Sequence, residues 1–504
     1  MSSLKKTAIW ITLLAIVLKL SGFLRESIIA KQFGANEYTD GYLLAFSFIT
    51  LVVAMISTGF NNVFLPLYVQ HRKENAALTE KNAIGILNIT VLLFLAATVL
   101  GYFFVPTLVP FIFGDMHPTT EEVAVHITQF FFLFMSAIAL NGILESYLQA
   151  RRVFVPSQIS KLLATLLGAL FALLFAQIWG IYSLAYGFIV GTLLGILIQF
   201  VYLYKHGFRW SPTIKVEKEF SKVFIALIVP SLLNSVVGQV NMFVDKIFAS
   251  STIEGAVTYL NNASLLVSIP NAIYGTTIAA IIFTLLSEQV NQKEKFQQTF
   301  FMGVEISLLT LMPIAAGLLV VGDAVISFIY ERGMFTSLDK ENTYKALVFY
   351  LPLIVTQGLQ FIVSKSMYAQ GKTAIVFRIS VTTIVVNILL NWILVDRFGY
   401  PGLALSSSIV SIYYLTISSI VVYRGFDQLE TKKLIRLLVK VIPPTLIMAL
   451  PIYFLKGYIH YWYSLWQLAL LVPIGVLLYA FSLKIFYPEG FQRLLQLVKR
   501  KRPA

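Results

Sequence analysis

The stretch AIGILNITVLLFLAATVLGYFFV, residues 83–105, decides the class of fold. It contains no Asp, Glu, Lys or Arg, and it is as long as the roughly 20 residues that an α-helix needs to cross a bilayer core of about 30 Å. Because water is absent from that core, the backbone N–H and C=O groups must be satisfied within the segment, which favours a helix. The sequence therefore predicts a transmembrane helix at 83–105.

Similar stretches recur from one end of the chain to the other. The predicted spans are 8–32, 41–66, 83–105, 123–148, 158–178, 182–204, 223–249, 257–287, 301–328, 343–369, 375–395, 401–423, 435–455 and 462–486. Segments of about ten residues with alternating hydrophobicity, typical of an outer-membrane barrel, do not occur. We expect an all-α polytopic membrane protein with about 14 transmembrane helices.

The composition excludes several classes of protein. Of the 504 residues 58% are hydrophobic and 12% are charged, whereas soluble domains carry roughly 25% charge. The mean hydropathy is +0.80. There is no cysteine, which excludes disulfides and Cys-based metal sites, and no Walker motif, HExxH or nucleophile elbow. We therefore expect a transporter rather than an enzyme, and no cofactor beyond a coupling cation.

The net charge is +14, and the lysines and arginines are concentrated in every second loop between the predicted spans. Representative basic positions are Arg72, Arg151, Lys215, Lys293 and Lys432. The alternate loops contain acids such as Asp115, Glu254 and Asp339. The positive-inside rule predicts that both termini lie in the cytoplasm, and it explains the basic balance without nucleic acid as a partner. Because no convincing cleavage site follows the first apolar stretch, we expect a retained helix.

Part of the sequence repeats itself. Tyr147 begins YLQARR, which leads to WGIYSLAYG, and Tyr368 begins YAQGK, which leads to FGYPGLALS. Repeated halves are typical of alternating-access transporters, whose substrate site lies between the halves near the midplane. We expect an N-lobe of helices 1–6 at 1–215, a C-lobe of helices 7–12 at 216–428, and helices 13–14 with a basic cytoplasmic tail at 429–504.

Charges inside the first two predicted spans point to a binding site, because each costs roughly 2.5–3.5 kcal/mol or more at a helix centre. One interpretation is that Arg25 and Glu26 pair with neighbours such as Asp40 and lock the helices together. The other is that Lys19 and Arg25 face a central cavity and bind an anionic headgroup. Lys19 lies mid-span and cannot snorkel far. The candidate substrate-binding residues are Lys19, Arg25, Glu26, Asp40, Asn61 and Asn62.

A second candidate site would bind a cation. Asn387 and Asn391 are four residues apart on one helix and share a face. With Asp245 and Ser407 they would supply oxygen ligands from three helices, an environment that suits a hard cation. Since there is a single carboxylate, we expect Na⁺ or H⁺ rather than a divalent metal. The alternative is that Asp245 and Lys246 simply neutralise each other.

The block GFLRESIIAKQFGANEYTD at 22–40, with AF at 45–46 and NNVFLPLY at 61–68, resembles the MurJ (MviN) family of lipid II flippases. This family belongs to the multidrug/oligosaccharidyl-lipid/polysaccharide exporter superfamily. Its members open with a GFxRD-type turn, an FGA turn, TDA, AF and a following FVP. The stretches RGMFT at 332–336 and FVP at 154–156 are similar too, so the resemblance covers the whole chain.

The resemblance implies two six-helix lobes, a central cationic cavity for the diphosphate-sugar, and a groove beside helices 13 and 14 for the lipid tail. By position, Lys19, Arg25, Glu26 and Asp40 match charged family positions, and Lys19 replaces a usual Arg. The departures are Val53, where the family usually has Arg, and Leu265 and Ser268, where Arg and an acid are common.

The expected function is translocation of an undecaprenyl-diphosphate-linked sugar, with lipid II for peptidoglycan synthesis as the leading substrate, across the cytoplasmic membrane. An exopolysaccharide or teichuronic-type repeat unit is the first alternative. A cation-coupled multidrug exporter of the same fold is the second, and cations such as Lys19 argue against it because they repel cationic drugs. A scaffold without transport is the third. Expected partners are the lipid-linked glycan, membrane lipids and the cell-wall or polysaccharide synthesis machinery.

Overall fold

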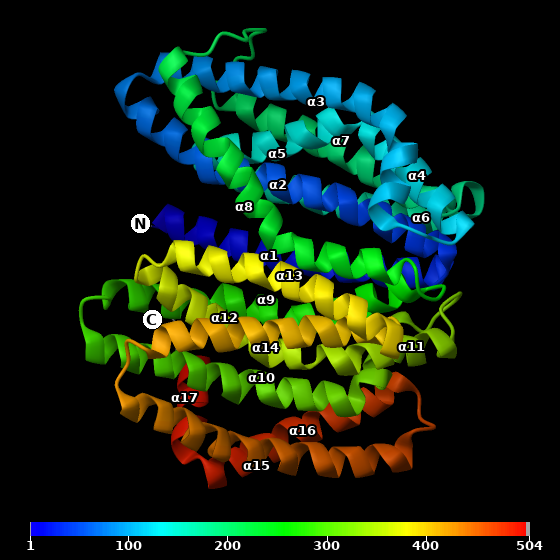
Figure 1. Ribbon diagram of the computed structural model, residues 1–504, viewed down its shortest axis with the longest axis vertical. Coiled ribbons are helices and arrows are strands. Elements are labelled where there is room, and N and C mark those ends of the chain that lie inside the picture. The colour runs from blue at the N-terminus through cyan, green and yellow to red at the C-terminus, as the bar shows by residue number, and fades with distance from the viewer. Residues whose placement is uncertain (1, 500–504) are drawn as a thin grey trace. The chain divides into compact units, whose positions relative to one another are not determined.

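The computed structural model describes the backbone of residues 2–499. It also describes the side chains of that range, except those at 2–13, 15, 233–234, 236–238, 276–277, 280, 428–431 and 497–499. Every regular element in the described range is an α-helix (Figure 1). The helices are α1 (Ser2–Phe33), α2 (Glu37–Glu74), α3 (Ala76–Phe113), α4 (Pro118–Leu133), α5 (Met135–Ala150), α6 (Val155–Trp179), α7 (Tyr182–Lys205), α8 (Lys218–Ala249), α9 (Ala256–Glu288), α10 (Lys293–Tyr330), α11 (Ser337–Tyr350), α12 (Pro352–Ala369), α13 (Thr373–Phe398), α14 (Pro401–Tyr423), α15 (Gln428–Ile459), α16 (Ser464–Phe486) and α17 (Pro488–Lys499).

The lengths of these helices confirm a polytopic membrane protein. Among the described residues, 10 helical segments are long and apolar enough to cross a membrane, or 11 if the bent pair α4–α5 is one span. Helices α1, α8 and α9 have 32, 32 and 33 residues, which is also more than a bilayer core requires. Each of these three helices coincides with one of the predicted spans, at 8–32, 223–249 and 257–287.

Two predicted spans are interrupted. The span at 123–148 consists of α4 and α5, which meet at Phe134 with a bend of 59°. The span at 343–369 consists of α11 and α12, which meet at Leu351. Pro352 follows directly and removes one backbone donor, while Leu351 keeps helical backbone angles (φ −54°, ψ −37°). The predicted basic tail also contains a helix of its own, α17.

The helices form two compact units. Unit 1 comprises Met1–Thr258 and Gly333–Phe335, and unit 2 comprises Tyr259–Arg332 and Thr336–Ala504. Unit 1 therefore includes α8, whereas the predicted N-lobe ends at residue 215. The predicted lobes, 1–215 and 216–428, are parts that should move as units during transport. Their boundaries stay a prediction.

The sequence repeat reappears in the backbone. Three left-handed positions of the first half, each at or just after the end of a helix, recur 219 residues later. They are Gly114, Arg152 and Gly180 (φ 69°, 61° and 52°), with counterparts Gly333, Gly371 and Gly399 (φ 61°, 71° and 63°). Glycine adopts such angles without steric cost, so Arg152 is the strained member of the set. A spacing of 219 residues pairs Gln149 with Tyr368. The sequence comparison, which aligned Tyr147 with Tyr368, is therefore out of register with the backbone repeat by two residues.

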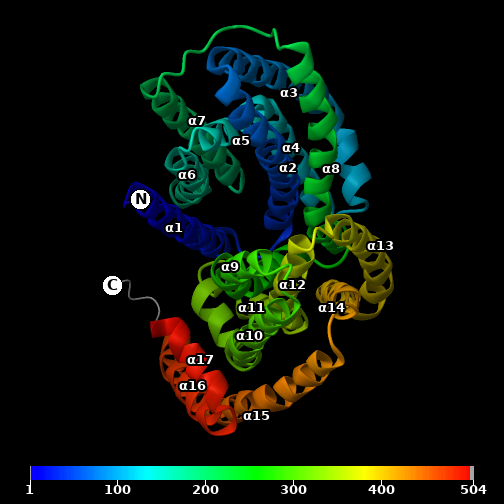
Figure 2. The same cartoon turned by 90° about the vertical axis from the view of Figure 1, so that its left-hand side faces the viewer.

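In unit 1, α6 and α7 lie side by side and pack through small residues (Figures 1 and 2). Gly187, Gly191 and Gly195 recur every four residues and share one face of α7. A Cβ atom added at Gly187 would lie 2.3 Å from the carbonyl oxygen of Leu167, and one at Gly191 would lie 2.5 Å from the Cα of Ala164. The two backbones therefore touch, as membrane helices do where small residues meet.

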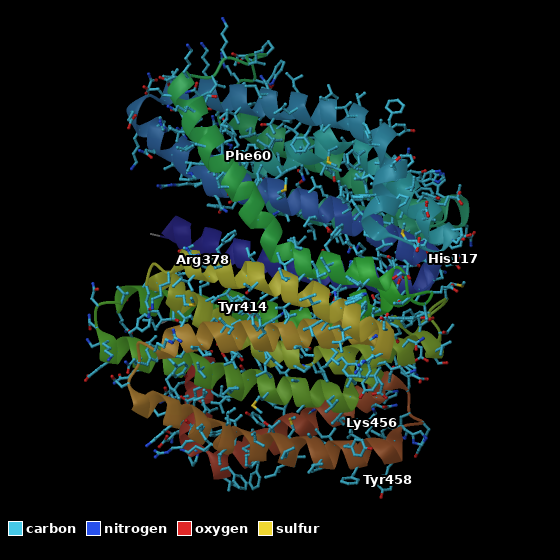
Figure 3. All side chains as sticks on the ribbon, in the orientation of Figure 1. Phe60, His117, Arg378, Tyr414, Lys456 and Tyr458 are labelled. Carbon is cyan, nitrogen blue, oxygen red and sulfur yellow. The ribbon has the colours of Figure 1, made fainter. Side chains whose placement is uncertain are left out.

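In unit 2, the hairpin of α15 and α16 is bound to α10 at both ends. At one end Lys456, labelled in Figure 3, pairs with Asp323 and donates a hydrogen bond to the carbonyl oxygen of Val320 at 2.8 Å. At the other end Glu305 of α10, which is fully buried, accepts hydrogen bonds from Tyr487 and Arg493. These contacts hold the hairpin along the length of α10.

Candidate functional site

The two basic residues of α1 have different surroundings. Lys19 has an exposed side chain and no ion pair within the part of the chain that the structure describes. Arg25 donates from Nε to Glu26 Oε1 at 3.1 Å, and its guanidinium lies 4.5 Å from the centroid of the Phe46 ring on α2. Glu26 is only 2% exposed. Arg25 therefore has a partner within its own unit, while Lys19 stays accessible.

Asp40 is positioned by the start of α2. Asn36 caps this helix by accepting a hydrogen bond from the backbone N–H of Thr39 at 3.1 Å, which sets Asp40 in the first turn. The Asp40 carboxylate accepts hydrogen bonds from the backbone N–H and the hydroxyl of Thr258, at 2.9 and 2.6 Å. These bonds and the Arg25–Glu26 pair replace the predicted pairing of Arg25 with Asp40.

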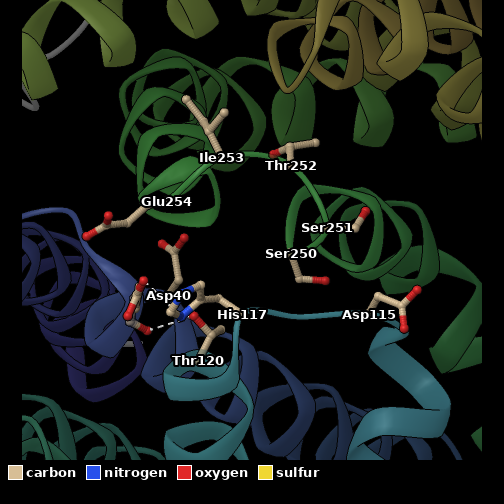
Figure 4. A pocket seen from close by; sticks show the side chains of 10 residues that line it. Asp40, Asp115, His117, Thr120, Ser250, Ser251, Thr252, Ile253 and Glu254 are labelled. Carbon is tan, nitrogen blue, oxygen red and sulfur yellow. Dashed lines mark hydrogen bonds and ion pairs between the residues drawn. The ribbon is translucent and has the colours of Figure 1, made fainter.

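Asp40 also lines a cavity of about 190 Å³ in unit 1 (Figure 4). The cavity is lined by Glu37, Asp40, Asp115, His117, Thr120, Ser250, Ser251, Thr252, Ile253 and Glu254. His117 pairs with Glu37 at 2.8 Å, and the other three carboxylates leave the lining acidic. Such a lining repels a diphosphate. Among the described residues, no group of three or more His, Asp or Glu side chains is arranged to hold a metal ion.

Asn61 and Asn62 lie far along α2 from Asp40. The rise of an α-helix is about 1.5 Å per residue, so the distance from Asp40 to Asn61 along α2 is about 30 Å. Asn61 is partly buried and Asn62 is exposed. The six predicted substrate-binding residues therefore do not form one cluster, and their role in binding stays a prediction.

The residues of the predicted cation site divide between the two units. Asp245 belongs to unit 1, where it is 5% exposed. Asn387 and Asn391 are fully buried on α13 in unit 2. The side-chain amide of Asn387 lies 3.4 Å from the hydroxyl of Ser406, the neighbour of the predicted Ser407 on α14. Helices α13 and α14 therefore contact each other at Asn387 and Ser406, and cation binding at the predicted set stays a prediction.

Sequence reasoning missed the charged group at Glu145 of unit 1, and it considered Lys246 only as a partner of Asp245. Glu145 of α5 is buried and accepts hydrogen bonds from Ser57 at 3.0 Å and Gln149 at 3.1 Å, and it also pairs with Lys161 of α6. Lys246 of α8 is directed toward Ser47 of α2, at 2.6 Å. The usable signal was the presence of ionisable side chains within apolar stretches, which in membranes face a bundle interior or a partner.

A sequence model of the family described as "Lipid II flippase MurJ" matches residues 29–474. Two proteins named "Probable lipid II flippase MurJ" are each 24% identical to this chain. For the protein of Buchnera aphidicola subsp. Acyrthosiphon pisum, the alignment covers 91% of this chain and 92% of the relative. For the protein of Thermotoga maritima, it covers 98% and 99%.

Solved structures show the same fold. "Lipid II flippase MurJ, inward closed conformation" has a TM-score of 0.83 at 24% identity and covers 95% of this chain and 99% of its own. An inward-facing multidrug resistance MATE family transporter of the MOP superfamily has a TM-score of 0.68 at 13% identity and covers 80% and 92%. At these identities, the likeness concerns the fold alone.

Proposed function

This chain belongs to the lipid II flippase MurJ family, and from that membership we propose that it moves lipid II from the cytoplasmic to the outer leaflet of the bacterial inner membrane. It is a multi-pass membrane transporter and not an enzyme. Its substrate is a lipid-linked glycan, and its surroundings are membrane lipids. The proposed route is alternating access, in which the binding site opens first to one side of the membrane and then to the other.

The accessible ammonium of Lys19 is the observation that supports this substrate most directly. A diphosphate that enters an apolar cavity loses hydration and must regain it from fixed positive charge. Lys19 lies in the middle of a 32-residue helix, where an unneutralised cation is costly unless water or an anionic ligand meets it. A bound anionic headgroup would neutralise this ammonium and offset the free-energy cost of placing it in the membrane.

The same charge disfavours a multidrug exporter. The MATE likeness shows that the fold is shared, and fold alone does not set the substrate. A pocket for cationic drugs would be acidic and aromatic, and the cation at Lys19 repels such ligands. The family match and the two relatives named for lipid II therefore favour lipid II over drugs and over other repeat units.

We further propose that both termini lie in the cytoplasm. We also propose that transport is coupled to the binding of Na⁺ or H⁺ at Asp245. The alternation of basic and acidic loops supports the orientation. Association with the cell-wall synthesis machinery is a proposal too, since a flipped precursor must be consumed at the outer face.

The test is depletion rescue. A bacterium depleted of its own lipid II flippase is complemented with this chain, and accumulation of cytoplasmic lipid II is measured. We expect growth and normal lipid II turnover. Growth restored with the wild-type chain and lost with Lys19→Ala, at equal amounts in the membrane, supports the proposal. Failure of the well-expressed wild-type chain would exclude lipid II and leave another lipid-linked glycan as the substrate.

A further inference from the structure

The segment between α7 and α8, residues 206–217, forms a strap that is bound to the beginning of α3 in unit 1 (Figure 2). The strap contains no helix or strand. The side-chain amide of Asn88 on α3 donates hydrogen bonds to the carbonyl oxygens of Ser211 and Thr213, at 2.8 and 2.7 Å. Its Oδ1 accepts a hydrogen bond from the indole N–H of Trp210 at 3.0 Å. Asn88 therefore holds the middle of the strap through three hydrogen bonds.

A second contact lies nearer the start of α3. The buried Asn82 accepts a hydrogen bond from the backbone N–H of Glu217 at 2.9 Å. Between the two asparagines, a Cβ atom added at Gly85 would lie 2.7 Å from Cγ2 of Val216 and 3.1 Å from the carbonyl oxygen of Lys215. The strap is therefore in close contact with the α3 backbone, and its position along this helix is fixed.

The strap crosses α3 where this helix enters the membrane. The predicted span begins at residue 83, and Asn88 lies five residues further, which is about 7.5 Å along the helix axis. From Ile89 onward α3 exposes large apolar side chains, among them Leu92, Leu93 and Leu95. An exposed apolar surface on a spanning helix is in contact with lipid tails. The strap thus lies at the level where the headgroups meet the acyl chains.

The exposed side chains of the strap are apolar and basic. Trp210 and Ile214 are 51% and 58% exposed. Next to them in sequence, Arg209 and Lys215 are exposed too, and neither forms an ion pair within the described residues. Tryptophan concentrates at membrane interfaces, because its ring is apolar while its N–H is polar. Basic side chains at the cytoplasmic surface are attracted to anionic lipids.

We propose that the strap is a docking surface for anionic phospholipids of the cytoplasmic leaflet. Trp210 and Ile214 insert between the headgroups and the acyl chains, and Arg209 and Lys215 contact lipid phosphates. A loop that only obeys the positive-inside rule needs neither exposed apolar side chains nor a fixed backbone. Because the strap is bound to α3, its attachment to lipid holds the end of this helix at a fixed depth. This role is independent of the transported substrate.

Fluorescence quenching by brominated lipids tests the inference on the full-length chain in nanodiscs. The chain has no cysteine, so Pro212→Cys places a single fluorophore on an exposed position of the strap and keeps Trp210 and Ile214. Lys73→Cys, an exposed position near the end of α2 and outside its predicted span, is the reference. The nanodiscs are made of phosphatidylcholine with equal fractions of either brominated phosphatidylglycerol or brominated phosphatidylcholine.

We expect strong quenching of the fluorophore at Pro212→Cys, and more by the brominated phosphatidylglycerol than by the brominated phosphatidylcholine. The double variant Arg209→Ala with Lys215→Ala should reduce this lipid preference by about fivefold for each basic side chain removed. High salt should reduce the preference as well. Lys293→Ala with Lys295→Ala is the matched control, because it removes two exposed lysines of α10, and it should keep the preference.

Three outcomes would overturn the inference. Quenching at Pro212→Cys that is no stronger than at Lys73→Cys would place the strap in water, where a soluble partner could reach it. Equal quenching by the two brominated lipids would mean that the strap does not recognise an anionic headgroup. An equal loss of preference in the strap variant and in the α10 control would mean that net charge alone attracts the lipid. The depletion rescue tests the proposed function separately, so either proposal can fail without the other.

Discussion

Arg493 of α17 forms an ion pair with Glu305 of α10, and the Glu305 side chain is fully buried. Removal of one partner from a buried pair strands the other charge, and the usual cost is about 3–5 kcal/mol. Arg493 is 44% exposed, so we expect Arg493→Ala to cost less, about 2 kcal/mol. The midpoint of thermal unfolding in detergent should fall.

Two further variants test whether the loss of stability comes from the Arg493–Glu305 pair. Arg436→Ala, which removes an exposed arginine of α15, should leave the midpoint unchanged. The double variant Arg493→Leu with Glu305→Leu should recover much of the stability, because an apolar pair of similar volume needs no charge compensation. A midpoint for Arg493→Ala equal to that of the wild type would show that α17 does not anchor the hairpin.

Gly191 tests the close contact of α6 with α7. A leucine at this position would place its Cβ against the backbone of Ala164, so the helices must separate. We expect Gly191→Leu to lower the midpoint of thermal unfolding by several degrees or to prevent accumulation. The control is Gly317→Leu on α10, where an added Cβ meets no atom within 4 Å. Equal behaviour of the two variants would contradict the packing.

Lys19 and Arg25 are expected to differ in transport. Lys19→Ala should abolish flipping while the protein still accumulates, and Lys19→Arg should retain much of the activity, because the charge is kept. For Arg25, the pair with Glu26 offers a structural role. Flipping rescued in Arg25→Ala with Glu26→Ala would assign Arg25 to that role, whereas continued loss at normal expression would support binding.

The membrane topology can be tested by labelling introduced cysteines, and there is no background from native cysteines because the chain has none. A cysteine at Glu254 should react with an impermeant thiol reagent from outside the cell, and a cysteine at Lys215 should react only after the membrane is permeabilised. The basis is the alternation of acidic and basic loops. The reverse labelling pattern would invert the orientation.

Cation coupling depends on Asp245. If this carboxylate holds Na⁺ or H⁺, Asp245→Asn should reduce flipping and remove its dependence on the ion gradient, because the only charged ligand of the set is lost. The measurement is flipping in proteoliposomes with imposed Na⁺ or pH gradients. Unchanged transport with unchanged ion dependence would mean that the predicted site does not exist.

The sequence by itself determined the spans, the helical class and the candidate charges. Segment length and hydropathy are local properties, and the bilayer forces any long apolar segment into a helix. For this reason the sequence alone predicts a span at 83–105, and α3 contains it. The resemblance at 22–40 then led to the family that the comparison confirmed.

Only the tertiary structure decided which charges meet. Whether Lys246 reaches Ser47, or Arg493 reaches Glu305, depends on helix rotation and packing between segments 199 and 188 residues apart. Periodicity along one helix cannot supply that information, because it orders side chains only around their own axis. The sequence could thus show that Lys246 is a costly charge in a membrane, while the packing of α8 along α2 decided that it reaches Ser47.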